Sequence, residues 1–189
     1  MSLVPYVKFS SEQLEKIGNT VVYLADRIEN LSKTKLLKLL YILDEISIKK
    51  SGIPMLNLKY KVWKFGPVSE ELFIDLSSEP TLLEKFIDRD IEGNFIVSKV
   101  KFNEDEFSEN DIDLMNFVIE KYGDKTAKEL ISYTHRVNAP WHNTAMEKAV
   151  LELLENEIIN NTEYVIDMSS IILHDERKLE IYKEYIETH

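Results

Sequence analysis

The stretch SKTKLLKLLYILDEISIKKSGIPMLNLKYKVWKFGPVS, residues 32–69, decides the fold of this chain. Its first half predicts a helix that begins after a cap at Ser32 and stops at Gly52. Apolar residues cover more than half of the circumference of this helix. An ordinary surface helix carries one apolar stripe. We therefore expect this helix to lie at the centre of the domain, in contact with other elements on several sides.

The second half of the stretch predicts an extended segment and a rigid turn. Residues 58–63 alternate between apolar and other side chains, as a half-buried strand does. Gly66 and Pro67 then break the chain, and Ser69 is placed to cap a short helix over 70–76. Pro67 fixes its own φ angle and biases Gly66 toward an extended conformation, so the turn should hold one shape.

Patterns elsewhere predict a mainly α chain. Ser10 is a candidate cap for an amphipathic helix, because apolar residues recur every three or four positions from Leu14 to Ile28. Five further helices are expected over 81–88, 109–122, 127–135, 144–160 and 175–188. Residues 95–97 and 100–102 predict a small β-ribbon, and residues 164–166 either a short strand or a cap leading onward.

These elements predict a single-domain bundle of six to eight helices with a small β-ribbon and a C-terminal helical extension. We divide the chain into an N-terminal helix over 1–30, a main helical domain over 31–144 and an extension over 145–189 that packs on it. The last helix is highly charged and has only a thin apolar stripe. It should therefore dock on the main domain or pair with a second copy as a homodimer.

Composition bounds the class of protein. The 189 residues are 44% apolar and 30% charged, which is sufficient for a buried core and a soluble surface. The chain has no run of 18 apolar residues and no basic-then-apolar signal at its start. We therefore expect a cytoplasmic protein that does not span a membrane. Because the chain has no cysteine, disulfides and thiolate metal sites are excluded.

Charge is unevenly distributed along the chain. The net charge is −11, which argues against a general nucleic-acid binder because phosphate contacts need an excess of lysine and arginine. Residues 1–70 nevertheless carry 11 basic against 7 acidic side chains, and residues 31–64 hold eight of the lysines. This basic region is either a solvated face or a docking patch for an acidic partner, including the chain's own acidic half.

The sequence contains no catalytic or cofactor motif that we recognise. The five glycines form no phosphate-binding loop, and there is no nucleophile elbow. His135 and His142 are separated by Pro140, and no third ligand follows at a suitable spacing for zinc. We expect a structural hydrogen bond at His135, exposure of His142, and no catalytic residue, metal or cofactor.

Two tryptophans lie beside turns. Trp63 precedes the Gly66-Pro67 break, and Trp141 directly follows Pro140. Each indole either plugs the core next to its turn or offers a large rigid contact to a partner. Tyr41, on the central helix, should be a core residue whose hydroxyl reaches the rim.

Several short motifs occur in a fixed order. The first group comprises Lys35-Leu36, Lys38-Leu39-Leu40-Tyr41, YKVWKFGPV over 60–68, and Glu71-Leu72-Phe73; the second comprises Tyr122-Gly123, Thr126, Leu130, Thr134-His135 and Pro140-Trp141. In this order, over residues 31–144, they resemble the Panacea antitoxin domain of phage-associated, SocA-like proteins. The resemblance implies a helical antitoxin that neutralises a cognate toxin protein by direct binding and is not an enzyme. It also implies a cytoplasmic protease as a second partner, because SocA-like members present their toxins to one.

The resemblance and the residue types together assign roles to thirteen residues. The predicted partner-binding residues are Lys35, Lys38, Tyr41, Trp63, Lys64, Gly66, Pro67 and Val68, and the predicted structural residues are Leu39, Leu40, Thr134, His135 and Trp141. Three rival functions remain. One is a DNA-binding autoregulator that uses the lysines of 31–64. The others are a phage-derived protease adaptor or host-interaction protein without a toxin mate, and a carboxylate-based hydrolase.

Overall fold

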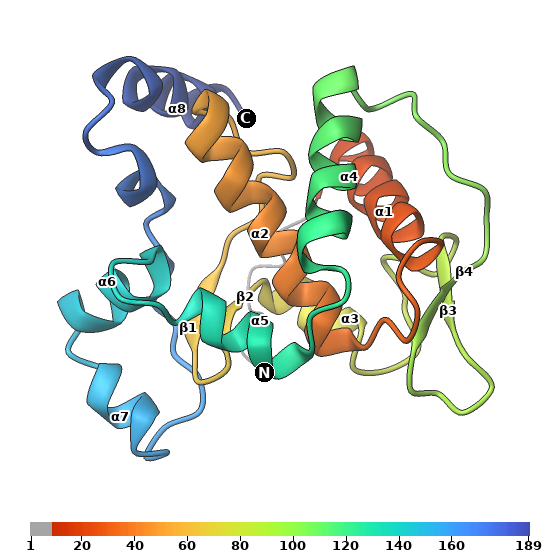
Figure 1. Cartoon of the computed structure of the whole chain (residues 1–189), viewed down its shortest axis with the longest axis horizontal. Coiled ribbons are helices and arrows are strands. Elements are labelled where there is room, and N and C mark those ends of the chain that lie inside the picture. Colours follow the sequence, from red (N-terminus) through yellow and green to blue (C-terminus); the bar gives the residue numbers. More distant parts are fainter. Residues whose placement is uncertain (1–8) are drawn as a thin grey trace, which may run out of the picture.

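The computed structural model describes residues 9–189, which form eight α-helices, one 3₁₀ helix and two small sheets (Figure 1). The elements are α1 (Ser11–Ala25), α2 (Lys33–Ser51), β1 (Lys61–Trp63), β2 (Gly66–Val68), α3 (Glu70–Asp75), β3 (Ile87–Arg89), β4 (Ile96–Ser98), α4 (Glu109–Tyr122), α5 (Ala127–Thr134), α6 (Pro140–Glu147), α7 (Leu151–Glu155), η1 (Met168–Ile172) and α8 (Glu176–Thr188). The predicted fold class, mainly α with a small β component, is confirmed.

Helix α2 runs through the middle of the molecule (Figure 1). It contacts α3, α4, α5, α8, η1 and β2, and 12 of its 19 residues are buried. Its ends are marked as the sequence predicts. The Ser32 hydroxyl accepts a hydrogen bond from the Lys35 amide, and Gly52 ends the helix at φ +81°. The continuous apolar surface of α2 is therefore explained by neighbours on several sides.

One buried apolar cluster includes side chains from Ile17 in α1 to Ile172 in η1. Helix α1 and the residues after 144 therefore contribute to the same core as α2. Helix α8 contributes the partly buried Leu179 and Tyr182 to its edge. The division of the chain at residues 30 and 144 stays a prediction, and residues 1–8 of its first part lie outside the described residues.

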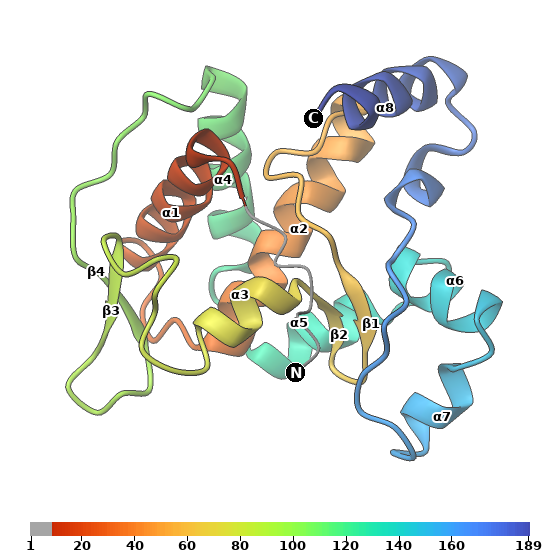
Figure 2. The same ribbon diagram turned by 180° about the vertical axis from the view of Figure 1, so that it is seen from behind.

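A β-hairpin replaces the simple break expected at Gly66-Pro67. Strand β1 pairs antiparallel with β2, with Trp63 opposite Gly66, and Lys64 and Phe65 form the turn. The segment after α7 runs along the other edge of β1 (Figure 2). There the Val62 amide donates to the Tyr164 carbonyl at 2.9 Å. The predicted strand at 164–166 is thus an isolated bridge to β1.

The predicted helix over 81–88 is wrong. The Asp75 carboxylate at the end of α3 accepts hydrogen bonds from the amides of Thr81, Leu82 and Leu83 at 2.7–3.2 Å. These bonds hold the chain in turns, after which residues 87–89 form β3. The ribbon is correspondingly β3 with β4, and residues 100–102 take no part in it.

The predicted continuous helix over 144–160 is also wrong. Helix α6 begins earlier, at Pro140, whose missing amide hydrogen is tolerated at the first helical position. It ends at Glu147, and Ala149 has φ +54°, a conformation incompatible with a right-handed helix. Helix α7 then forms one short separate segment.

The connection from α2 to β1 is organised by one buried carboxylate. Asp44 is 1% exposed and accepts hydrogen bonds from the Leu56 amide at 2.6 Å, the Leu58 amide at 3.2 Å and the Tyr60 hydroxyl at 2.8 Å. Burial raises the pKa of the Asp44 carboxyl, and these hydrogen bonds oppose that rise. The carboxylate thereby fixes the path of the chain into the hairpin.

We expect Asp44→Ala to lower the free energy of unfolding by about 3 kcal/mol, because it leaves buried donors without an acceptor. Urea denaturation measures the loss. Asp113→Ala, at an exposed position of α4, is the matched control and should change the free energy of unfolding by less than about 0.5 kcal/mol. Equal effects of the two substitutions would contradict this role for Asp44.

Candidate partner-binding site

Motif residues from distant parts of the sequence meet at β2. Lys38 is 1% exposed, and its ammonium donates a hydrogen bond to the Pro67 carbonyl at 2.8 Å. Burial lowers the pKa of Lys38 to about 7. This bond ties the hairpin to the central helix.

Gly66 is the point of closest approach between the hairpin and α5. A Cβ atom at this position would lie 2.6 Å from the Thr134 hydroxyl oxygen and 3.1 Å from Cε of Lys38. It would also lie 3.4 Å from Nε2 of His135. Gly66 has φ +95°, a conformation that other residues adopt only with strain. Both the backbone angle and the space therefore require glycine here.

Trp141, in helix α6, joins the end of the second motif group to the hairpin. Its indole N–H donates to the Trp63 carbonyl at 2.9 Å, and the side chain is 1% exposed. The His135 ring stacks on Trp141 with the ring centroids 3.8 Å apart and the planes 6° from parallel. We call Lys38, Gly66, Thr134, His135 and Trp141 the motif node, because these residues hold the hairpin against α2 and α5.

The histidine predictions need correction. The hydrogen bond expected at the His135 ring is not formed within residues 9–189, and its buried Nε2 atom has no partner there. Burial lowers the pKa of His135 to about 4, and the nearby charges of Lys38 and His142 act in the same direction. His135 is therefore a neutral stacking ring at neutral pH. His142 is half-buried rather than exposed.

The predicted partner-binding residues do not share one surface. Six of them are buried: Lys35, Lys38, Tyr41, Gly66, Pro67 and Val68. The Tyr41 hydroxyl, expected at the rim, is enclosed and has no hydrogen-bond partner among the described residues. Tyr41 thus offers no surface to a partner in this conformation, and a charge reversal at the buried Lys38 would place a carboxylate in the core. The predicted structural residues Leu39 and Leu40 are buried as well.

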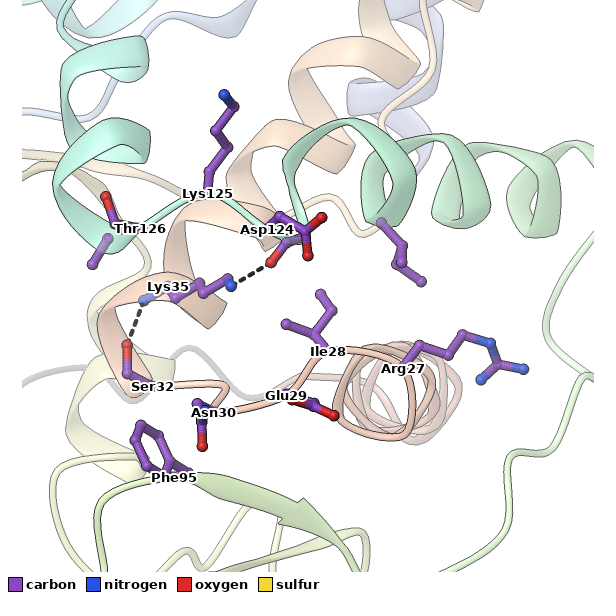
Figure 3. Close-up of a pocket in the computed structure, with 13 residues that line it drawn as sticks. Arg27, Ile28, Glu29, Asn30, Ser32, Lys35, Phe95, Asp124, Lys125 and Thr126 are labelled. Carbon is purple, nitrogen blue, oxygen red and sulfur yellow. Dashed lines mark hydrogen bonds between the residues drawn. The ribbon is translucent and has the colours of Figure 1, made fainter.

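Lys35 lines an open pocket of about 600 Å³ at the start of α2 and α5 (Figure 3). Its ammonium donates to the Gly123 carbonyl, so this charge already has a partner. Arg27 and Glu29 lie on the opposite side of the pocket, and Asp124 is near the Lys35 ammonium (Figure 3). Charges of both signs line the pocket, and this mixture selects neither an anion nor a cation.

An exposed aromatic surface adjoins the motif node. Phe65, at the hairpin turn, is 57% exposed although it is large and apolar. Beside it lies a cavity of about 80 Å³ that we call the aromatic pocket; its apolar lining comes from Leu37, Trp63, Phe65, Val68 and Phe73. The predicted partner-binding residues include Trp63 and Val68 but not Phe65 and Phe73, although the motifs contain both. The available signal was an aromatic residue next to Lys64 at the tip of a turn.

The described part of the chain contains neither a cluster of metal ligands nor a membrane-spanning helix. Within residues 9–189, no three histidine, aspartate or glutamate side chains are grouped so that they could hold a metal ion. In the same range, no helix is both long and apolar enough to cross a membrane.

The fold and the motif node define a mainly α domain built around a clamped hairpin. A family model described as "Antitoxin SocA-like, Panacea domain" matches residues 36–142, which is more than half of the chain. The protein belongs to this antitoxin family, and the resemblance inferred from the motifs is confirmed. Comparisons with curated proteins and with solved structures gave no match.

The motif node predicts a specific cost for a single methyl group. We expect Gly66→Ala to lower the free energy of unfolding by about 2–4 kcal/mol, because it adds crowding against Thr134 to the strain of a positive φ angle. Gly93→Ala is the matched control, since Gly93 has φ +75° but no atom within 4 Å of an added Cβ. Its loss should be about 1 kcal/mol. Equal losses in thermal or urea denaturation would show that the node is not tightly packed.

Proposed function

We propose that this protein is the antitoxin of a toxin–antitoxin pair and neutralises its cognate toxin by direct binding, without a catalytic step. Membership of the SocA-like Panacea family supports an antitoxin role. The observation that carries the binding mode is the clamped hairpin, which presents the exposed Phe65 beside the aromatic pocket.

A clamped hairpin is a favourable binding element for a physical reason. Association costs conformational entropy when loops and side chains become ordered, and an element that is already ordered avoids much of that cost. The hairpin is held by Lys38 from α2 and by Trp141 from α6. Aromatic side chains in such positions frequently dominate binding energy. The proposed interface therefore includes Trp63, Lys64 and Phe65.

The basic residues of 31–64 support a DNA-binding role less well. Phosphate binding needs lysines that project together toward solvent. Lys38 is buried, and the Lys35 ammonium donates to a backbone carbonyl. Lys61 and Lys64 form ion pairs with Glu163 and Glu157, respectively. Four of the eight lysines are thus engaged within the protein, and Lys33, Lys49, Lys50 and Lys59 remain to face a nucleic acid.

Co-expression with the protein encoded by the adjacent reading frame tests the proposal. We expect that neighbour to arrest growth when expressed alone, and we expect this protein to restore growth and to co-purify with it. A stable complex with unchanged toxin level indicates neutralisation by binding. A neighbour that is harmless alone and does not co-purify would contradict the proposed function.

A further inference from the structure

We infer that the aromatic pocket receives one large apolar side chain from a partner segment whose flanking residues are acidic. The identification of the natural partner as the toxin rests on the proposed function. The preference of the pocket for an apolar side chain with acidic neighbours is independent of it. Three features of this face carry the inference: the size and lining of the pocket, an unsatisfied donor in its wall, and the cations around it.

The pocket suits a side chain rather than a small-molecule ligand. Its volume is about 80 Å³, whereas pockets for drug-sized ligands and cofactors measure about 300–1,000 Å³. The Trp63 and Phe73 rings meet edge to face in its wall, with centroids 4.9 Å apart. Phe65 forms the exposed side of the same wall. An inserted apolar group would cover the Phe65 ring and fill the space between these aromatic residues.

Trp63 also has an unmet hydrogen-bonding requirement. Its indole Nε1 is buried and has no acceptor within residues 9–189, although buried polar groups in proteins are nearly always paired. Trp141, by contrast, uses its indole N–H to hold the Trp63 carbonyl. A carbonyl or carboxylate oxygen on an inserted segment would supply the acceptor that Trp63 lacks.

The charges beside the pocket favour an acidic segment. The Lys33 ammonium lies 4.2 Å from the centroid of the Phe73 ring, and the Lys64 ammonium lies 4.9 Å from that of Phe65. Within residues 9–189, neither Lys33 nor its neighbour Arg89 forms an ion pair with a carboxylate. The chain as a whole carries a net charge of −11, so these two cations belong to a protein that is acidic overall. The Lys33 ammonium would attract a carboxylate beside an inserted apolar side chain, and the Lys64 ammonium would do so by exchanging its partner Glu157.

Peptide titration followed by NMR tests the inference on the full chain. The probe is the peptide acetyl-Glu-Asp-Leu-Glu-Asp-amide, compared with the same peptide carrying alanine at its centre and with acetyl-Lys-Lys-Leu-Lys-Lys-amide. The chain has two tryptophans, so Trp63→Phe assigns both indole N–H signals. We expect the acidic leucine peptide alone to shift the Trp63 signal, to leave that of Trp141 in place, and to bind more weakly at high salt.

Matched variants locate the binding. Phe65→Ala should weaken the peptide at least fivefold, while Phe117→Ala, which removes a 38% exposed ring from α4, should have no effect. Lys33→Glu should weaken it similarly, and the exposed Lys101→Glu should not. Lys33 is the first residue of α2, where a carboxylate is compatible with the helix dipole, so this variant should keep its fold.

Several results would overturn the inference. They are an unmoved Trp63 signal, equal binding of the alanine-centred or the lysine peptide, and unchanged affinity in Phe65→Ala. The growth test reports separately on the proposed function. If the protein does not bind the peptide but restores growth, the inference about the pocket is wrong and the antitoxin role stands. If it binds the peptide but does not restore growth, the inference about the pocket stands and the antitoxin role is wrong.

Discussion

The hydrogen bond from the buried Lys38 ammonium to the Pro67 carbonyl is the interaction on which the rest of the structure depends. Removing an ammonium from water is costly unless it is hydrogen-bonded, and here the cost appears as a pKa lowered to about 7. A carbonyl at this position satisfies the lysine whether it is charged or neutral, because both forms donate. The central helix can therefore hold the hairpin through a polar contact inside an apolar core.

Two further contacts complete the clamp around the hairpin. Gly66 lets the Thr134 end of α5 approach the strand, and Trp141 holds the Trp63 carbonyl from α6. Helices α2, α5 and α6, which are distant in sequence, thus all contact the eight-residue β1–β2 hairpin. The motif residues Lys38, Gly66, Thr134 and Trp141 form this clamp, and the surface proposed for recognition lies next to it at Phe65.

The sequence predicted those elements whose ends are fixed by local chemistry. Helices α1, α2, α4, α5 and α8 begin after Ser10, Ser32, Ser108, Thr126 and Asp175, whose side chains cap them. The failures come from contacts that a local pattern does not contain. Asp75 captures the amides of the expected helix at 81–88, and Ala149 interrupts the one at 144–160. The β1–β2 pairing was not predicted because a Gly-Pro pair is typical of a chain break.

The sequence indicated which residues belong to the motifs but not which way their side chains point. The motifs contain the residues that meet around Gly66, but these residues were divided between a predicted partner-binding set and a structural set. The sequence placed Tyr41 in the core but did not show that Lys38 is buried, because α2 has neighbours on several sides and offers little solvent-facing surface that would indicate orientation. Phe65 was missed because exposure of an aromatic residue depends on tertiary packing. From sequence alone, a single apolar residue in a turn can equally well be packed into the core or exposed to solvent.

Hydrogen exchange in Lys38→Met tests most directly whether the Lys38–Pro67 bond holds the hairpin. Methionine keeps much of the side-chain volume but donates nothing. We predict that the amides of Val62 and Lys64, which hydrogen-bond to the Tyr164 and Asn160 carbonyls, exchange about tenfold faster than in the wild type, while those of α1 and α4 keep their rates. Unchanged protection of the hairpin amides would contradict the account.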